Sequence, residues 1–171
     1  MLSGHCLVDA TASDTGVRMF AAHFDSHHEN LRFVEARYLR SLVAASAFRD
    51  AKYVLAGDLN SLSRRDPYAP DLDHKIRISG TAKFGQPPRF EVIGELEELG
   101  WIDTLYVQRD GAVVPPEWIT ARRDRGGVHI DYRTDYIFVS PPLAERVISA
   151  RIAPAGGASD HDAVVAEFGL T

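Results

Sequence analysis

Four short apolar segments of this chain each adjoin ionisable or amide side chains. MFAA precedes His23, YVLAG precedes Asp58 and Asn60, YIFV follows Asp135, and AVVAEF follows Asp160 and His161. Short apolar runs without a helical period are typical of strands buried in a sheet. Strand tips lie at the solvent edge of a sheet, where polar groups are held in place at little cost. The pattern therefore predicts a mixed α/β fold, of the α/β or α+β class, whose strand ends converge on a polar site.

The intervening segments predict a hairpin and two helices. Residues 4–23 are apolar and partly alternating around a turn-forming stretch at 13–16, which favours a hairpin that ends at His23. Residues 30–48 are expected to form a helix with Asn30 as N-cap. Its buried stripe is expected to contain Leu31, Val34, Tyr38, Leu42 and Ala45. Residues 90–99 predict a second helix that stops at Gly100.

The second half of the chain predicts mainly strands and loops. Residues 61–89 contain several prolines and many polar residues, which indicates a long surface excursion. Residues 128–140 alternate and are rich in β-branched and aromatic side chains, so they are expected to form the strongest strand. Residues 147–153 and 163–168 predict two further strands, joined by a glycine-containing loop that leads into Asp160 and His161.

Composition indicates one globular domain over residues 1–171. Hydrophobic residues make up 45% of the chain and charged residues 25%. The sequence shows neither a secretory signal nor a membrane-spanning run, so a cytoplasmic protein is expected. Cys6 lies in an apolar segment, where a buried structural thiol is the simplest interpretation. The formal net charge of −5, without a long basic run, argues against a strong non-specific binder of nucleic acid.

Four motifs in order resemble the endonuclease/exonuclease/phosphatase superfamily. AAHFD is similar to the family strand that ends in T-H-L, AGDLNS to G-D-F-N, TDYIFVS to R-I-D-Y-I-F, and SDHDAV to S-D-H-x-P-V. The ordered set spans most of the chain. Thr134 stands where the family usually has Ile, and Ala163 where Pro usually follows. The resemblance implies part of a four-layered α/β sandwich and a phosphate-ester substrate, with nucleic acid as one class.

The resemblance also implies roles for an acid–base set. His161 resembles the general base that deprotonates or orients the attacking water. Asp135 resembles the carboxylate that fixes the tautomer of that imidazole and stabilises its protonated form. His23 resembles the histidine that donates a hydrogen bond or proton to the phosphoryl group or the leaving oxygen.

The remaining site residues resemble ligands of water, phosphate and metal. Asp58 resembles the water-orienting carboxylate and Asn60 the phosphate-binding amide; two positions apart, they would share one face of an extended chain. Asp160 resembles a ligand of Mg²⁺, with Mn²⁺ as a substitute. Mg²⁺ needs only one or two carboxylates besides water and substrate phosphate.

One departure opens an alternative function. The family's essential metal-binding Glu and an earlier Asn lie upstream of these motifs, and this chain does not contain them. Glu29 and Glu35 come too late in the order to replace that Glu. Either the chain is a truncated form, or a partner or a second copy in an oligomer supplies the rest. In the second case the chain is a non-catalytic half domain.

Three further sets of residues have both a functional and an ordinary interpretation. His27 and His28 beside Asp25 would suit a transition metal, although adjacent loop histidines are more often solvated. Trp101 and Trp118 could stack on a base, but a core role is favoured. The sequence contains neither a G-x-S-x-G element nor a catalytic cysteine context. Five arginines could contact substrate phosphates, with solvation at the surface as an equally good interpretation; they are Arg64, Arg65, Arg122, Arg123 and Arg125.

Overall fold

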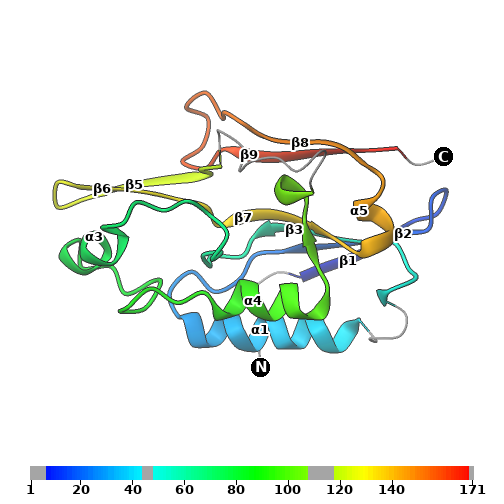
Figure 1. Ribbon diagram of the computed structural model, residues 1–171, viewed down its shortest axis with the longest axis horizontal. Coiled ribbons are helices and arrows are strands. Elements are labelled where there is room, and N and C mark those ends of the chain that lie inside the picture. Colours follow the sequence, from blue (N-terminus) through cyan, green and yellow to red (C-terminus); the bar gives the residue numbers. More distant parts are fainter. Residues whose placement is uncertain (1–6, 44–47, 108–117, 170–171) are drawn as a thin grey trace.

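A computed structural model describes residues 7–43, 48–107 and 118–169, and these form a mixed α/β fold as expected. A five-stranded sheet runs through the centre in the order β1-β2-β3-β7-β4 (Figure 1). Its strands are β1 (Leu7–Ala12), β2 (Val17–Ala22), β3 (Tyr53–Asp58), β4 (Ile102–Asp103) and β7 (Asp135–Val139). β1 and β2 pair antiparallel around a turn at 13–16, which confirms the expected hairpin. Cys6 lies outside the described residues.

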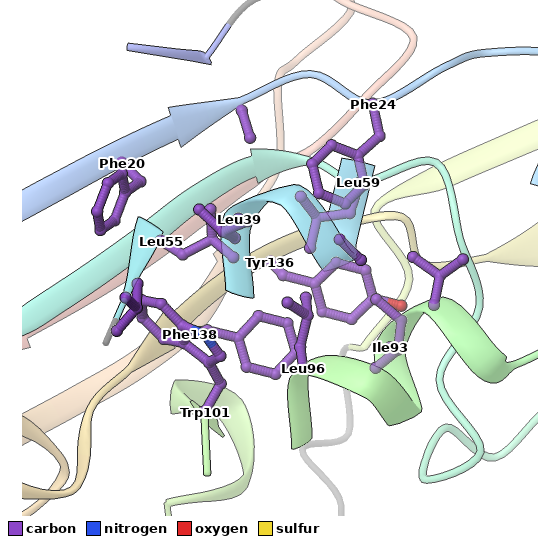
Figure 2. Packing of buried hydrophobic residues seen from close by; sticks show 14 of the residues in the cluster. Phe20, Phe24, Leu39, Leu55, Leu59, Ile93, Leu96, Trp101, Tyr136 and Phe138 are labelled. Carbon is purple, nitrogen blue, oxygen red and sulfur yellow. The ribbon is translucent and has the colours of Figure 1, made fainter. Parts of the chain in front are cut away.

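Two helices cover one face of this sheet. They are α1 (Glu29–Leu42) and α4 (Glu91–Leu99), which lie side by side below the strands in Figure 1. Between the helices and the sheet lies a core of large apolar side chains (Figure 2). Leu55, Phe138 and Leu96 are fully buried there. Trp101 also lies in this core, as expected, and is only 2% exposed. Gly100 ends α4 in the left-handed conformation, which confirms the predicted stop.

The predicted buried stripe of α1 was wrong for its first three residues, whereas Leu42 is partly buried against the core. Leu31, Val34 and Tyr38 are 42%, 52% and 46% exposed, respectively. The expectation counted apolar side chains only, whereas the inward side of the helix carries paired charges in addition to Ala36 and Leu39. The helix also begins at Glu29, with His28 at the N-cap in place of Asn30. Ala45 lies outside the described residues. The buried charged residues of α1 are Glu29, Arg32 and Glu35.

The expected surface excursion at 61–89 instead builds a second core. It contains α3 (Leu72–Ile78) and packs against the β5–β6 hairpin at one end of the molecule (Figure 1). Ile76 and Phe84 are buried between them. The segment is rich in proline and polar residues, yet it also supplies the buried apolar side chains Leu62 and Leu72 to this core. The hairpin strands are β5 (Ala121–Arg125) and β6 (Val128–Tyr132).

The run at 128–140 forms two strands in different sheets. β6 ends at Tyr132 and β7 begins at Asp135, so Arg133 and Thr134 form the junction. Both junction residues are fully buried. The region of Arg122, Arg123 and Arg125 is β5, because it pairs with β6 around Gly126 and Gly127. These two glycines have positive φ angles, which suit the turn.

A second two-stranded sheet packs near the other face of the central sheet. It consists of β8 (Val147–Ala153) and β9 (Ala163–Phe168), which confirms the two predicted strands. The short elements η1 (Thr104–Tyr106) and α5 (Pro141–Ala144) lie beside it. Toward β1 this face is open, since Val8 and Met19 are 58% and 43% exposed. Within the described parts of the chain, no helix has the length and apolar character to cross a membrane.

Candidate active site

Three strands bring their polar ends to one edge of the central sheet. β2 and β3 are parallel, so their carboxyl ends, which lead into His23 and Asp58, meet at the same edge. β7 runs antiparallel to β3, and Asp135 is the register partner of Asp58. The Nε2 atom of His23 lies 3.8 Å from Oδ2 of Asp58. The structure therefore brings together His23, Asp58 and Asp135.

His161 completes this edge from the loop that precedes β9. Its Nδ1 atom lies 2.8 Å from Oδ2 of Asp135. The hydrogen bond with Asp135 raises the pKa of His161, partial burial opposes the shift, and Asp58 and Asp160 add to it. The imidazole side chain is 27% exposed and that of Asp135 is 19% exposed. Nε2 is the ring nitrogen that this bond leaves for a water or substrate.

Thr120, which the sequence did not single out, holds the two halves of this pair together. Its buried Oγ1 accepts hydrogen bonds from the backbone N–H groups of Thr134 (3.2 Å) and Asp135 (3.3 Å). Its carbonyl accepts the N–H of Asp162 at 2.7 Å, next to His161. Thr120 thus fixes both the start of β7 and the end of the loop that carries His161.

Asp162 anchors the same loop from its other side. Oδ1 accepts the backbone N–H of Ala155 at 2.9 Å, and Oδ2 accepts from Nη1 of Arg122 at 2.8 Å. The bond with Arg122 lowers the pKa of Asp162. The sequence offered one signal for this residue, the second Asp of SDHD. We conclude that Arg122 acts here as a structural partner of the loop.

Asn60 is oriented differently from the expectation. It does not continue an extended strand beside Asp58, because β3 ends at Asp58 and Asn60 has φ 52°. Its N–H donates to Oδ1 of Asp58 at 2.8 Å, and its Nδ2 donates to the carbonyl of Phe24 at 2.9 Å. The side chain is 1% exposed. Asn60 therefore links the end of β3 to the chain beyond His23.

Asp160 lies apart from the carboxylate–imidazole cluster. It is exposed, and its charge contributes to the raised pKa of His161 and to that of Tyr132. One ligand atom from each of Asp58, Asp135 and His161 lies within 4.8 Å of the other two, so these three could hold a cation. A carboxylate-only Mg²⁺ site would use Asp160 or Asp58 with water and phosphate oxygens.

Glu29 and Glu35 do not contribute carboxylates to this edge. Oε2 of Glu29 accepts from Nε of Arg32 at 3.0 Å, and this pair is buried. Oε2 of Glu35 accepts the backbone N–H of Asp25 at 2.8 Å. Burial raises the pKa of Glu29, and Arg32 opposes that shift. Both glutamates therefore stabilise the segment that follows His23.

The other candidate sets have structural partners. Oδ1 of Asp25 accepts the backbone N–H groups of His27 and His28 at 2.8 and 2.6 Å, an arrangement typical of a turn. Arg64 lies over the ring of Phe90, and Arg65 lies over Tyr106 with Nη1 3.9 Å from Glu97. The ring of Trp118 packs edge to face on Tyr68, with centroids 5.1 Å apart.

A buried ion cluster lies behind the edge and was not anticipated. Nη2 of Arg133 lies 2.9 Å from Oδ1 of Asp66 and 2.6 Å from Oδ2 of Asp103. The guanidinium also lies over the ring of Tyr136, 4.3 Å from its centroid. The surrounding carboxylates raise the pKa of Arg133 against the effect of burial. Because Arg133 precedes Asp135 by two residues, the cluster fixes the entry to β7.

Comparison with known proteins identifies the family. The sequence model of the Endonuclease/Exonuclease/phosphatase family matches residues 4–161, and the chain belongs to this family. No curated protein matches the chain. Solved structures match it over most of its length with low sequence identity, so they establish similarity of fold.

Three solved structures illustrate that similarity. An AP endonuclease from Archaeoglobus fulgidus matches with a TM-score of 0.66 and 20% identity, over 95% of this chain and 64% of that chain. A 3′–5′ exonuclease from Neisseria meningitidis matches with a TM-score of 0.65 and 23% identity, over 95% and 64%. The endonuclease domain of the retrotransposon TRAS1 gives a TM-score of 0.56 and 19% identity, over 96% and 63%. The chain thus spans just under two thirds of these relatives.

Proposed function

We propose that the chain carries the catalytic edge of a divalent-metal-dependent phosphoesterase that hydrolyses a phosphodiester or phosphomonoester. The observation that carries this proposal is the 2.8 Å contact between Nδ1 of His161 and Oδ2 of Asp135. Family membership and solved neighbours named as an endonuclease and an exonuclease support it.

In this proposal His161 is the general base. Asp135 holds Nδ1–H, so Nε2 is the basic nitrogen that takes a proton from the attacking water. Asp58, whose Oδ1 already accepts the N–H of Asn60, keeps Oδ2 to orient that water. His23 is 62% exposed, which lets it donate to a phosphoryl or leaving-group oxygen. The side-chain amide of Asn60 is the proposed phosphate ligand, through the second N–H of Nδ2, since the first is donated to the carbonyl of Phe24.

Asp160 is the proposed metal ligand, and Mg²⁺ is the proposed ion, with Mn²⁺ able to replace it. The carboxylates near this edge offer hard oxygen atoms, which suit these ions. When bound, the ion would neutralise charge on the phosphoryl oxygens. A cytoplasmic location remains a prediction.

The test is hydrolysis of bis(p-nitrophenyl) phosphate, p-nitrophenyl phosphate and a DNA duplex, each with Mg²⁺, with Mn²⁺ and with EDTA. We expect metal-dependent turnover of at least one substrate, and we expect His161→Ala to abolish it. Turnover that persists in EDTA, or that survives in His161→Ala, contradicts the proposal.

One observation favours a second candidate, a domain that is inactive alone and active when another polypeptide covers its open sheet face. Val8 and Ala21 are register partners, as are Ala10 and Met19, and all four are exposed apolar side chains. Contiguous exposed apolar surface commonly marks an interface. Sedimentation velocity together with the same assays separates the two candidates, because a stable monomer with metal-dependent turnover excludes the second.

A further inference from the structure

A cavity of about 560 Å³ lies next to the catalytic edge and has a strongly cationic wall. It is open to solvent and is bordered by residues 26–28, which follow β2, by residues 81–83, and by the end of β5. Lys83, Arg123 and Arg125 line it, together with His27 and His28, and none of the described lining residues is acidic. Because the whole chain has a formal charge of −5, this concentration of cations is a local property of the cavity.

Lys83 joins this cavity to the catalytic edge. Its Nζ atom lies 5.3 Å from the ring centroid of Phe84 and 5.6 Å from that of Tyr132. Burial lowers the pKa of Lys83, and the carboxylates of Asp58 and Asp135 oppose this shift. The structure shows no ion pair of Lys83 with any residue in its described ranges. The ammonium is therefore held by aromatic rings and is available to an anion.

Arg123 borders the same junction. Burial raises the pKa of Tyr132, the neighbouring Arg123 guanidinium opposes the shift, and the charges of Asp58 and Asp160 add to it. Tyr132 thus lies within range of both the cavity wall and the proposed metal ligand. The end of β6, where Tyr132 lies, therefore joins the cavity wall to the region of Asp160.

Arg125 differs from its neighbour Arg122 in having no partner. Arg122 is held by Asp162 and lies 3.8 Å from Asp131. The side chain of Arg125 is exposed and forms neither a hydrogen bond nor an ion pair with any residue that the structure describes. Guanidinium groups match the oxygens of phosphate, and a free one at a cavity mouth is suited to that ligand.

We propose that this cavity binds a second, non-scissile phosphate group of the substrate, with Arg125 and Lys83 as its principal ligands. The inference rests on the proposed phosphoesterase function and names a feature of its substrate. Small-molecule sites commonly measure about 300–1,000 Å³, so the cavity has room for the phosphate and for the group that carries it. That phosphate is either the next one along a nucleic-acid strand or a second one on a small molecule.

The test compares substrates with one and with two phosphates in Arg125→Ala and Lys83→Met, with Arg151→Ala on β8 as the control. Arg151 is exposed and carries the same charge, so it matches the charge change at a distant position. Loss of one charge-assisted contact should raise the KM for a two-phosphate substrate by about 10- to 100-fold. The KM for bis(p-nitrophenyl) phosphate, which has one phosphate, should rise less than the KM for the two-phosphate substrate, and Arg151→Ala should change neither value.

Two binding experiments distinguish a nucleic-acid strand from a small molecule as the carrier of the second phosphate. Neither experiment needs turnover. Fluorescence anisotropy of a labelled oligonucleotide and calorimetry of a nucleoside bisphosphate are measured without metal. Weaker binding of the oligonucleotide alone in Arg125→Ala indicates a strand, and weaker binding of the bisphosphate alone indicates a small molecule. If Arg125→Ala and the control bind both ligands equally, the proposal is overturned. If binding responds but no variant or parent turns over substrate, the proposed function fails and the site stands.

Discussion

Nδ1 of His161 lies 2.8 Å from Oδ2 of Asp135, although Asp135 begins β7 of the central sheet and His161 lies 26 positions later, in the loop that precedes β9. Asp135 is in turn the register partner of Asp58 on β3. A single carboxylate therefore links the imidazole to the strand ends of the central sheet. The proposed base depends on this link for both its orientation and its proton affinity.

Replacing Asp135 should move the pH profile of hydrolysis. The bond with Asp135 raises the pKa of His161 above 6.5, and a base must be unprotonated, so the parent should gain activity as pH rises through that raised pKa. In Asp135→Asn this acidic limb should shift to lower pH, while kcat falls by about 10²- to 10⁴-fold, the usual contribution of a general base. The measurement is kcat/KM against pH; an unshifted limb contradicts the pairing.

The same pair should make stability depend on pH with a defined sign. A raised pKa means that the folded state binds the proton of His161 more tightly than the unfolded state does. The stabilisation is therefore fully present below the unfolded pKa and is lost as pH rises through the folded one. Asp135→Asn should be more destabilised relative to the parent at about pH 5 than at about pH 8. Urea unfolding at both values measures this, and an equal difference at both would refute it.

Gly57 should tolerate no side chain. Its φ is +141°, and a Cβ at this position would lie 1.9 Å from the carbonyl oxygen of Ala22 on β2. Gly57→Ala should destabilise the fold by about 3 kcal/mol or more, since strain and a backbone clash add. Gly80→Ala is the matched control, with a φ of +66° and open space around the added carbon. Equal losses of stability in the two variants, measured by chemical denaturation, would show that backbone strain accounts for the loss without the clash at Ala22.

The strand ends were predictable from the sequence because a short apolar run indicates a buried strand. His23, Asp58 and Asp135 were placed correctly since each adjoins such a run, and the sheet register then brings them to one edge. The helical stripe of α1 failed for the converse reason. Arg32 and Glu29 are buried as an ion pair, and no count of apolar residues finds that.

Residues that act across the fold left no local signal. Thr120 bonds to Asp135 across 15 positions, and Lys83 reaches the site from a segment expected on the surface. The break at Arg133 was hidden because both flanking strands have β propensity, while the buried ion pairs that turn the chain there come from distant residues. Tertiary partners decide such positions, and a single sequence does not display them.

Arg133 should be far more important for stability than an exposed arginine with the same kind of partner. Its ion pairs with Asp66 and Asp103 are completely buried, so Arg133→Met leaves two uncompensated carboxylates and should cost about 3–5 kcal/mol. Arg18→Met breaks the exposed pair with Asp9 and should cost far less, because water screens that pair. Thermal and urea unfolding of both variants provide the comparison. Similar losses would indicate that the buried cluster is solvated in the native state.

Thr120 should prove to be a positioning residue whose hydroxyl holds Asp135 in place beside His161. Thr120→Val keeps the shape of the side chain but leaves the buried N–H groups of Thr134 and Asp135 without their acceptor, at a cost of about 1–3 kcal/mol. Because Asp135 then loses its fixed position, the acidic limb of the pH–rate profile should shift in the same direction as in Asp135→Asn. Thr120→Ser retains the oxygen and should restore the limb. A variant that loses stability while its limb stays in place would show that Thr120 supports the fold without setting the proton affinity of His161.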